Sequence, residues 1–279
     1  MAKMSIKIPI LMYHDIELGN PEYDRTEIED RPYVLPEPQF EEQMKFLSEQ
    51  GYRTVSLVDF VSHVKSNNPL PEKSVIITFD DGHISNYLKA CPILKKYGFK
   101  AVFFIVAGFV GRRGMLTWDQ IRDMANKGME IGSHTLTHSP PSKLSNEELE
   151  YELKESKRIL EDQLGQEVKW LSSPTGYYNR AIESIAKDVG YEVVCTSKFG
   201  VNSRNSNLFS LERIAIKRSY SMADFESLIR FESFTLLQFK VGELFRSNLK
   251  KILGMRLYEI IRKQLLNLQM RSPKNSFLK

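Results

Sequence analysis

The sequence predicts an α/β protein, with a barrel of parallel strands as the favoured architecture. Short runs rich in β-branched and aromatic residues alternate with amphipathic helical segments through most of the chain, which is typical of βα units around a parallel sheet. The 279 residues suit a single α/β barrel domain. No Gly-x-Gly-x-x-Gly or P-loop pattern follows a strand, which disfavours a nucleotide-binding sheet.

About eight runs have the composition of strands, and glycines or capping residues bound the helices between them. The pattern from Ser145 to Glu148 is a capping box, and Gly165 is expected to end the helix that it opens. The residues 17–38, rich in proline, glycine and charge, are expected to form a long loop near the substrate cleft. The expected strands span residues 8–13, 54–58, 75–80, 101–106, 129–134, 168–173, 191–197 and 211–216.

Charge divides the chain into an expected barrel domain, residues 1–232, and a basic amphipathic helical tail, residues 233–279. Residues 240–279 carry ten Lys or Arg and two Glu, a net charge of +8. Because the whole chain has a net charge of +4, residues 1–239 have a net charge of −4. Apolar residues of the tail recur at helical spacing. Such a helix can lie on an anionic membrane surface, cover the barrel or pair with a partner.

Location and partners follow from the same composition. No apolar run approaches the roughly 18 residues of a membrane span, and the first residues lack the pattern of a secretory signal. We therefore expect a cytoplasmic protein, with peripheral contact at the inner membrane face as a further option. Nucleic-acid binding is not expected because the basic residues cluster on the tail without a base-reading module. The oligomeric state is not predicted.

Two adjacent carboxylates end the apolar strand predicted over residues 75–80. Asp80 and Asp81 stand where parallel strands of α/β proteins face their ligands. Successive strand residues point in opposite directions, so both can reach one centre only if the chain turns, which Gly82 permits. The structural alternative is a helix cap beside a solvated aspartate.

The strand predicted over residues 129–134 ends in one histidine, and a second follows four residues later. His134 and His138 can converge on one ion if the strand runs into a helical turn. Imidazole and carboxylate together suit Zn²⁺ or a similar divalent ion. The pair alone could equally be surface or capping histidines, but together with Asp81 it predicts a site of two histidines and one aspartate, with open positions for water and substrate.

Three segments together resemble the polysaccharide deacetylases, the nodulation-type carbohydrate esterases. They are Thr78-Phe-Asp-Asp-Gly82, Ser133-His-Thr-Leu-Thr-His138 and Ser172-Ser-Pro-Thr-Gly-Tyr-Tyr-Asn179. The resemblance covers roughly residues 8–230, and Tyr13-His14 resembles the permuted branch with an N-terminal Tyr-His motif. The resemblance to the family implies a distorted (β/α) barrel of seven to eight strands. It also implies an enzyme that hydrolyses N-acetyl groups on amino sugars of a glycan or a lipid-linked glycan precursor. The implied cofactor is a divalent ion, and Zn²⁺ is the expected one among such ions.

The resemblance also implies roles for individual residues. Asp80 corresponds to the general base, a role that suits a carboxylate kept off the metal. His14 is assigned as the acid that protonates the leaving amine; its alternative is a satisfied polar residue at a strand end. The metal ligands are Asp81, His134 and His138, and the oxyanion or substrate-binding residues are Thr175, through its backbone N–H, Pro174 and Tyr177.

The sequence departs from the family pattern in two places. No histidine follows His138, so the late acid of many members is missing, and His83 is left as a residue that lines the site or caps a helix. Ser172 stands where many members carry an arginine that pairs with the base. Arg213 could substitute for it, although a surface salt bridge explains Arg213 equally well.

Two other functions stay open at this stage. Relatives of this fold also hydrolyse the amide of small nitrogenous rings. A catalytically silent glycan-binding protein would also fit the serine at position 172 and the missing late histidine.

Overall fold

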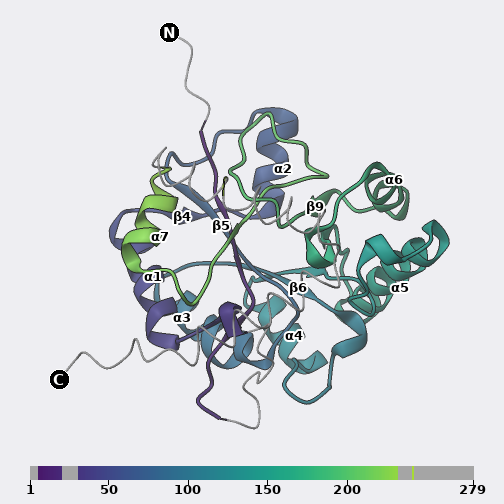
Figure 1. The fold of residues 1–279 in the computed structure, drawn as a ribbon, viewed down its shortest axis with the longest axis horizontal. Coiled ribbons are helices and arrows are strands. Elements are labelled where there is room, and N and C mark those ends of the chain that lie inside the picture. Colours follow the sequence, from purple (N-terminus) through teal and green to yellow (C-terminus); the bar gives the residue numbers. More distant parts are fainter. Residues whose placement is uncertain (1–5, 21–30, 232–240, 242–279) are drawn as a thin grey trace.

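The structure, a computed structural model, describes residues 6–20, 31–231 and 241. Its centre is a parallel sheet of eight strands in the order β10-β1-β5-β6-β7-β8-β9, with β4 pairing the start of β5 (Figure 1). A separate pair, β2 and β3, is also parallel. The strands are β1 (Ile10–Tyr13), β2 (Asp15–Ile16), β3 (Val34–Leu35), β4 (Arg53–Thr54), β5 (Ser74–Phe79), β6 (Val102–Ile105), β7 (Glu130–Ser133), β8 (Trp170–Ser172), β9 (Val193–Cys195) and β10 (Ile214–Ala215).

The two ends of the sheet are brought together by the segment that leads into β10. The Thr196 N–H donates to the Leu211 carbonyl, and the Leu211 N–H donates to the Val194 carbonyl, both at 2.9 Å. This segment therefore runs beside β9 before β10 pairs with β1. The expected distorted (β/α) barrel is confirmed as the fold class.

Helices lie around the outside of the curled sheet (Figure 1). The capping box of Ser145 and Glu148 forms as predicted, and Gly165 ends that helix in a left-handed conformation. The α-helices are α1 (Glu37–Glu49), α2 (Leu57–Ser66), α3 (Cys91–Lys96), α4 (Trp118–Asn126), α5 (Asn146–Leu164), α6 (Arg180–Val189) and α7 (Met222–Ile229), and the short 3-10 or π segments are η1 (Arg31–Tyr33), η2 (Asn86–Ala90), η3 (Ala107–Phe109), η4 (Pro141–Lys143) and η5 (Pro174–Gly176).

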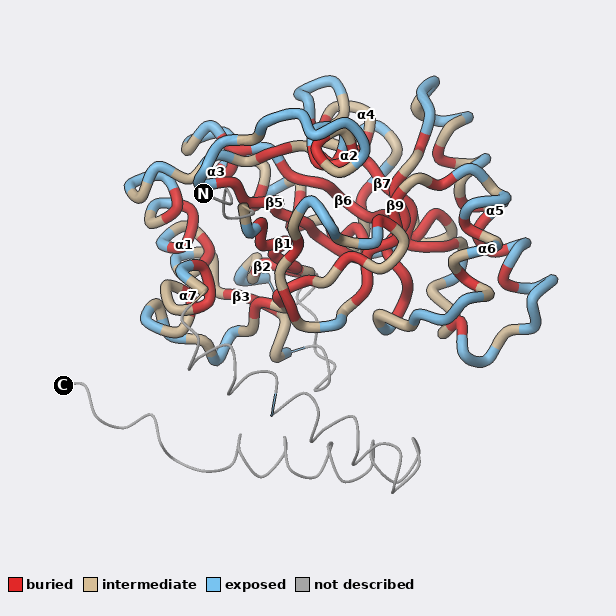
Figure 2. The backbone as a smooth tube through the Cα atoms, turned by 90° about the horizontal axis from the view of Figure 1, so that it is seen from above, coloured by how far each residue is buried: buried red, intermediate tan, exposed pale blue. Residues whose placement is uncertain are grey.

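Alternate residues of each strand belong to two different apolar clusters. In β5, Ile76 packs in the smaller cluster and Ile77 in the larger one; Phe104 and Phe103 of β6 divide in the same way. The smaller cluster takes residues from strands all around the sheet and from α2, so it fills the inside of the curl, whereas the larger one lies between sheet and outer helices. Figure 2 shows these buried strands in red at the centre.

Two expectations about local structure were wrong. The strand expected over residues 54–58 is only the two-residue β4, because Ser56 caps α2 by accepting a hydrogen bond from the Asp59 N–H and so starts a helix at Leu57. The expected loop of residues 17–38 contains η1, β3 and the first residues of α1. β3 is fixed there because it pairs with β2.

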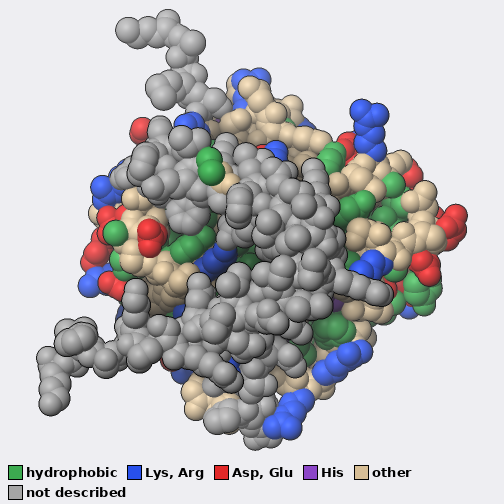
Figure 3. Space-filling view, in the orientation of Figure 1, with side chains coloured by type: hydrophobic (Ala, Val, Ile, Leu, Met, Phe, Trp, Pro, Cys, Tyr) green, Lys and Arg blue, Asp and Glu red, His purple; other side chains and the backbone are tan. Residues whose placement is uncertain are grey.

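The basic tail predicted over residues 233–279 lies outside the described residues, except for residue 241, so the boundary at residue 232 stays a prediction. Among the described residues, no helix is both long enough and apolar enough to span a bilayer. On the face seen in Figure 3, the visible described side chains of both charge signs are interspersed around the edge.

Candidate active site

The inward-facing positions change from apolar to polar at the carboxyl end of the sheet. In β5, Ile76 lies in the inner cluster, and the same face continues through Thr78 to Asp80. In β8, Trp170 lies in that cluster and Ser172 follows it on the same face. Strand periodicity therefore places a polar layer on top of the apolar barrel interior.

The chain turns sharply directly after Asp80. Asp81 has a φ of 75° and Gly82 a φ of 82°, so the left-handed turn already begins at the second aspartate. Aspartate tolerates this conformation better than most residues. Both carboxylates are buried as a result, Asp80 with 2% and Asp81 with 8% exposure. The sequence predicted a turn at Gly82, and the structure extends it by one residue.

Asp81, His134 and His138 lie close together. The Asp81 Oδ1 atom is 3.4 Å from His134 Nε2 and 3.5 Å from His138 Nε2. One ligand atom from each of the three residues lies within 4.8 Å of the others. Two ligands about 2.1 Å from one ion at a tetrahedral angle would be about 3.4 Å apart. The spacing therefore fits a shared divalent ion better than direct N–H···O hydrogen bonds, which are shorter.

His134 is oriented by its other ring nitrogen. Nδ1 lies 2.7 Å from the Ser172 carbonyl oxygen, which can only accept a hydrogen bond, so Nδ1 carries the proton. The Nε2 lone pair then faces Asp81. This arrangement, with one ring nitrogen bonded to a carbonyl, is usual for histidines that bind a metal. The residues present therefore fit a divalent ion.

Arg213 binds the Asp80 carboxylate with both terminal nitrogens. The distances are 2.8 Å from Nη1 to Oδ1 and 2.7 Å from Nη2 to Oδ2. Ser172 donates its hydroxyl to Asp80 Oδ2 at 3.1 Å, and Arg213 Nη2 donates to the same hydroxyl at 2.8 Å. The Arg213 side chain is fully buried. The surface salt bridge considered for Arg213 is therefore wrong.

Three more contacts fix the guanidinium in the barrel. Arg213 Nε donates to the Thr196 carbonyl at 2.8 Å, and Nη1 donates to the Thr78 hydroxyl at 3.2 Å. Phe104 lies beside the group, 5.7 Å from its centre. Sequence reasoning treated Ser172 only as the place of a lost arginine. Its position on the same strand face as Trp170 was the available signal that it would point at Asp80.

Opposite charges set the protonation of this cluster. Burial acts to raise the pKa of Asp80, but the charge of Arg213 and its hydrogen bonds to the carboxylate outweigh burial, and the pKa lies below its ordinary value. Burial also acts to raise the pKa of Asp81, but its histidine neighbours, His134 and His83 first, hold it well below its ordinary value. Both carboxyl groups are therefore ionised at neutral pH.

His14 lies at the junction of β1 and β2, at the same end of the barrel. A positive charge on His14 acts to lower the pKa of both Asp80 and Asp81. The Tyr33 ring packs against the imidazole at a centroid distance of 4.9 Å. Asn86 Nδ2 donates to the His14 carbonyl at 2.9 Å and so holds this stretch of backbone.

The other expected site residues lie around this centre. His83 is buried, with Nε2 3.5 Å from the second oxygen of Asp81. Pro174 is buried and Thr175 is exposed, in the short turn that follows β8. Thr175 has a φ of 59°. Tyr177 is half-buried, its carbonyl accepts a hydrogen bond from the Ser173 hydroxyl at 2.6 Å, and its own hydroxyl accepts one from Asn179 at 3.1 Å.

Comparison with known proteins agrees with this geometry. A family model described as polysaccharide deacetylase matches residues 67–194, which include Asp80, Asp81 and both histidines of the cluster. A relative from Bacillus subtilis, named "Putative polysaccharide deacetylase YxkH", is 33% identical over 223 residues, 80% of this chain and 76% of the relative. The chain belongs to the polysaccharide deacetylase family. It is a hydrolase of carbon–nitrogen bonds other than peptide bonds, as predicted.

Two further relatives of this polysaccharide deacetylase are informative. The structure of the Streptococcus pyogenes deacetylase PplD in complex with acetate is 32% identical, with a TM-score of 0.72, and the match covers 81% of this chain and 98% of that one. The poly-β-1,6-N-acetyl-D-glucosamine N-deacetylase of Staphylococcus aureus is 29% identical over 72% of this chain and 73% of the relative. The resemblance to the permuted branch stays a prediction.

Proposed function

We propose that this polysaccharide deacetylase uses a divalent ion to hydrolyse the N-acetyl group of an amino sugar within a glycan. The observation that carries the proposal is the arrangement of two aspartates with different partners. Asp81 faces two histidines at ligand spacing, whereas Asp80 faces an arginine and a serine. One carboxylate is thus suited to hold an ion and the other to accept a proton.

Asp81, His134 and His138 would hold the ion, with Zn²⁺ as the expected metal because its usual ligands are imidazole nitrogen and carboxylate oxygen. When bound, the ion supplies Lewis acidity, which polarises an acetyl carbonyl and lowers the pKa of water. Asp80 stays off the ion because both of its oxygens bind Arg213.

Proton transfer then divides between two side chains. Asp80 accepts a proton from the water that attacks the acetyl carbon, and the Thr175 N–H donates a hydrogen bond to the carbonyl oxygen as it gains charge. His14 donates a proton to the amide nitrogen, the carbon–nitrogen bond breaks, and acetate and a free amine are formed. The substrate class is supported by the relative from Staphylococcus aureus, whose name specifies a β-1,6-linked N-acetylglucosamine polymer.

A catalytically silent glycan-binding protein is now less well supported. That alternative rested partly on the absence of an arginine at position 172, and Arg213 supplies the guanidinium from another strand. A lipid-linked precursor at the inner membrane face stays a proposal that rests on the basic sequence of the tail, which lies outside the described residues.

The full chain, loaded with Zn²⁺, should be tested on a panel of N-acetylated oligosaccharides and lipid-linked sugars, with released acetate as the readout. Removal of the ion by a chelator should abolish acetate release, and Zn²⁺ should restore it. Asp80→Asn should keep one ion per chain but lower kcat by about 10²–10⁴-fold, the usual contribution of a positioned base. Asp188→Asn, an exposed aspartate, is the control and should behave as the wild type.

The outcomes separate the functions. Retained turnover in Asp80→Asn would contradict the assignment of the base. Opening of a cyclic amide without acetate release would favour the second enzyme hypothesis. Glycan binding by zinc-loaded protein without turnover of any substrate would favour the silent protein.

A further inference from the structure

The loop that carries both histidines has an unfavourable backbone. It runs from the end of β7 to His138, and two of its residues that are not glycine have positive φ, Thr135 at 66° and His138 at 60°. Residues other than glycine rarely adopt this conformation, because it brings Cβ too close to the following carbonyl oxygen. Contacts from outside the loop must therefore hold this conformation.

Glu152, on the second turn of α5, makes three of these contacts. One carboxylate oxygen, Oε2, accepts hydrogen bonds from the N–H groups of Leu136 and Thr137 at 2.9 and 2.8 Å. The other oxygen, Oε1, accepts one from the Thr137 hydroxyl at 2.5 Å. The carboxylate is thus bonded to the two residues between Thr135 and His138.

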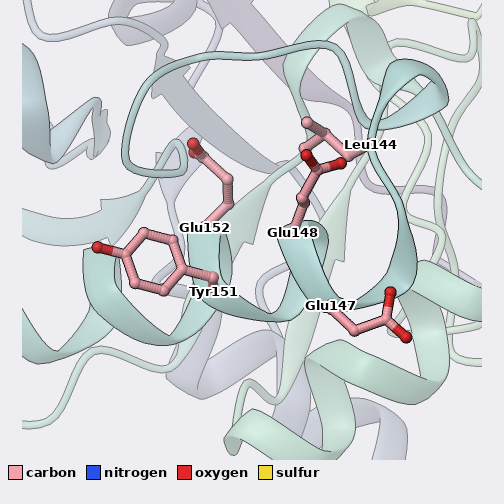
Figure 4. Close-up of a pocket in the computed structure, with 5 residues that line it drawn as sticks. All are labelled: Leu144, Glu147, Glu148, Tyr151 and Glu152. Carbon is pink, nitrogen blue, oxygen red and sulfur yellow. The ribbon is translucent and has the colours of Figure 1, made fainter.

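The environment of Glu152 distinguishes it from the other acidic residues at the start of α5. Glu152 is 8% exposed, whereas Glu147 and Glu148 are exposed. The three glutamates line a hollow together with Leu144 and Tyr151 (Figure 4). In this view the carboxylates of Glu152 and Glu147 lie on opposite sides of the hollow. A buried carboxylate is stable only when charge-assisted hydrogen bonds replace its hydration, and the loop N–H groups supply them.

The opposite side of the loop is held by η3. The Ala107 N–H donates to the Thr135 carbonyl at 3.1 Å, and the Gly108 N–H donates to the Leu136 carbonyl at 2.9 Å. A Cβ atom at Gly108 would lie 2.6 Å from that carbonyl oxygen, so the close approach requires glycine. The peptide groups of the loop are therefore bound on their carbonyl side by η3 and on their N–H side by Glu152.

The two histidines depend on this loop to different degrees. His134 directly follows β7, and its ring is held by the Ser172 carbonyl. The His138 side chain is 35% exposed and follows the two residues that Glu152 binds. A shift of these residues would move His138 relative to Asp81.

We propose that Glu152 is a positioning residue that fixes the loop so that His138 completes the metal site. The inference rests on the proposed function of Asp81, His134 and His138 as ligands. Glu152 itself is not one of the three residues that could hold the ion.

The test uses Glu152→Gln in the full chain. Glutamine has the same size, but it offers one acceptor oxygen and directs an NH₂ group at N–H donors. Zn²⁺ affinity, measured by competition with a chromophoric chelator, should fall by about 10–100-fold, as for other residues that orient metal ligands. The visible absorption spectrum of the Co²⁺-loaded variant should shift, because it reports ligand geometry. Glu150→Gln, the same change at an exposed position of the same helix, should alter neither.

If the wild type bound neither Zn²⁺ nor Co²⁺, the proposed function itself would be contradicted. If the wild type binds and Glu152→Gln keeps both its affinity and its Co²⁺ spectrum, the positioning role is overturned, even where the thermal stability of the metal-free protein falls. Should Glu152→Gln fail to fold, Thr137→Val removes the hydroxyl that contacts Glu152 and Ser139 and keeps both backbone N–H contacts to Glu152. It should produce a smaller loss of affinity with a spectral shift, and an unchanged spectrum would contradict the proposal.

Discussion

Arg213 binds both oxygens of Asp80, at 2.8 and 2.7 Å, although 133 positions separate the two residues in the chain. The arginine precedes β10 and the aspartate follows β5, and β1 lies between these two strands in the sheet. A planar guanidinium matches a carboxylate in this two-bond geometry, which the point charge of lysine cannot do. The pair thereby fixes the direction in which the proposed base points.

Replacement of Arg213 by methionine should reduce both stability and activity. The change leaves the Asp80 carboxylate buried without its charge partner, and the loss of one member of a buried pair typically costs about 3–5 kcal/mol. Urea denaturation should show this decrease in the free energy of unfolding. Arg213→Lys should unfold less easily than the methionine variant but still lose kcat, because the two-bond geometry is absent.

The control for this prediction is Arg180→Met, at an exposed position. It should leave both the unfolding midpoint and acetate release unchanged. A wild-type kcat in Arg213→Lys would show that catalysis does not need the two hydrogen bonds by which the guanidinium orients Asp80.

Replacement of His14 by glutamine should affect substrates according to their leaving group. An amide needs its nitrogen protonated before the bond breaks, and loss of a positioned acid typically lowers kcat by about 10²–10⁴-fold. The ester 4-nitrophenyl acetate releases 4-nitrophenolate, which leaves without being protonated. The kcat for hydrolysis of this ester should therefore change by only a few-fold. The measurement compares both substrates with wild type and variant at equal zinc occupancy.

His63 provides a matched control, because it is buried in α2 with its Nδ1 atom 2.6 Å from the Asn68 carbonyl oxygen. His63→Gln should affect the two substrates equally. An equal loss on both substrates in His14→Gln would argue against His14 as the acid.

Glu130 should make stability depend on pH between pH 4.5 and pH 7. Burial raises its pKa from 4.5 to about 7, although one oxygen accepts a hydrogen bond from the Leu57 N–H. The folded state therefore prefers the protonated form of Glu130. The contribution of this preference to the free energy of unfolding is fully present below pH 4.5 and is lost as the pH rises to 7. At about 1.36 kcal/mol per pKa unit, the loss amounts to roughly 3 kcal/mol.

Glu130→Gln stays neutral and keeps an acceptor for the Leu57 N–H. Its free energy of unfolding should exceed that of the wild type at pH 8 by up to roughly 3 kcal/mol and match it near pH 4.5. Chemical denaturation of both proteins at a series of pH values gives the difference. Glu150→Gln should show no such trend, and parallel pH curves for Glu130→Gln and wild type would contradict the prediction.

The sequence by itself determined what depends on local patterns. Alternating strands and helices gave the barrel class, and the capping residues around α5 fixed its ends. Asp80, Asp81, His134 and His138 were recognisable because they lie at or just after the ends of predicted strands. All of these signals lie within short segments, where side-chain periodicity and backbone preference act directly.

The tertiary structure decided which residues from distant segments meet. Arg213 could be a surface residue or a partner of Asp80 as long as the curl of the sheet was unknown, because only closure of the barrel brings the segment before β10 beside β9. Glu152 attracted no attention in the sequence, where it is one of many acidic residues on a helix. Its role arises because packing buries its carboxylate against the histidine loop, and a buried charge must take its partners from whatever the fold places beside it.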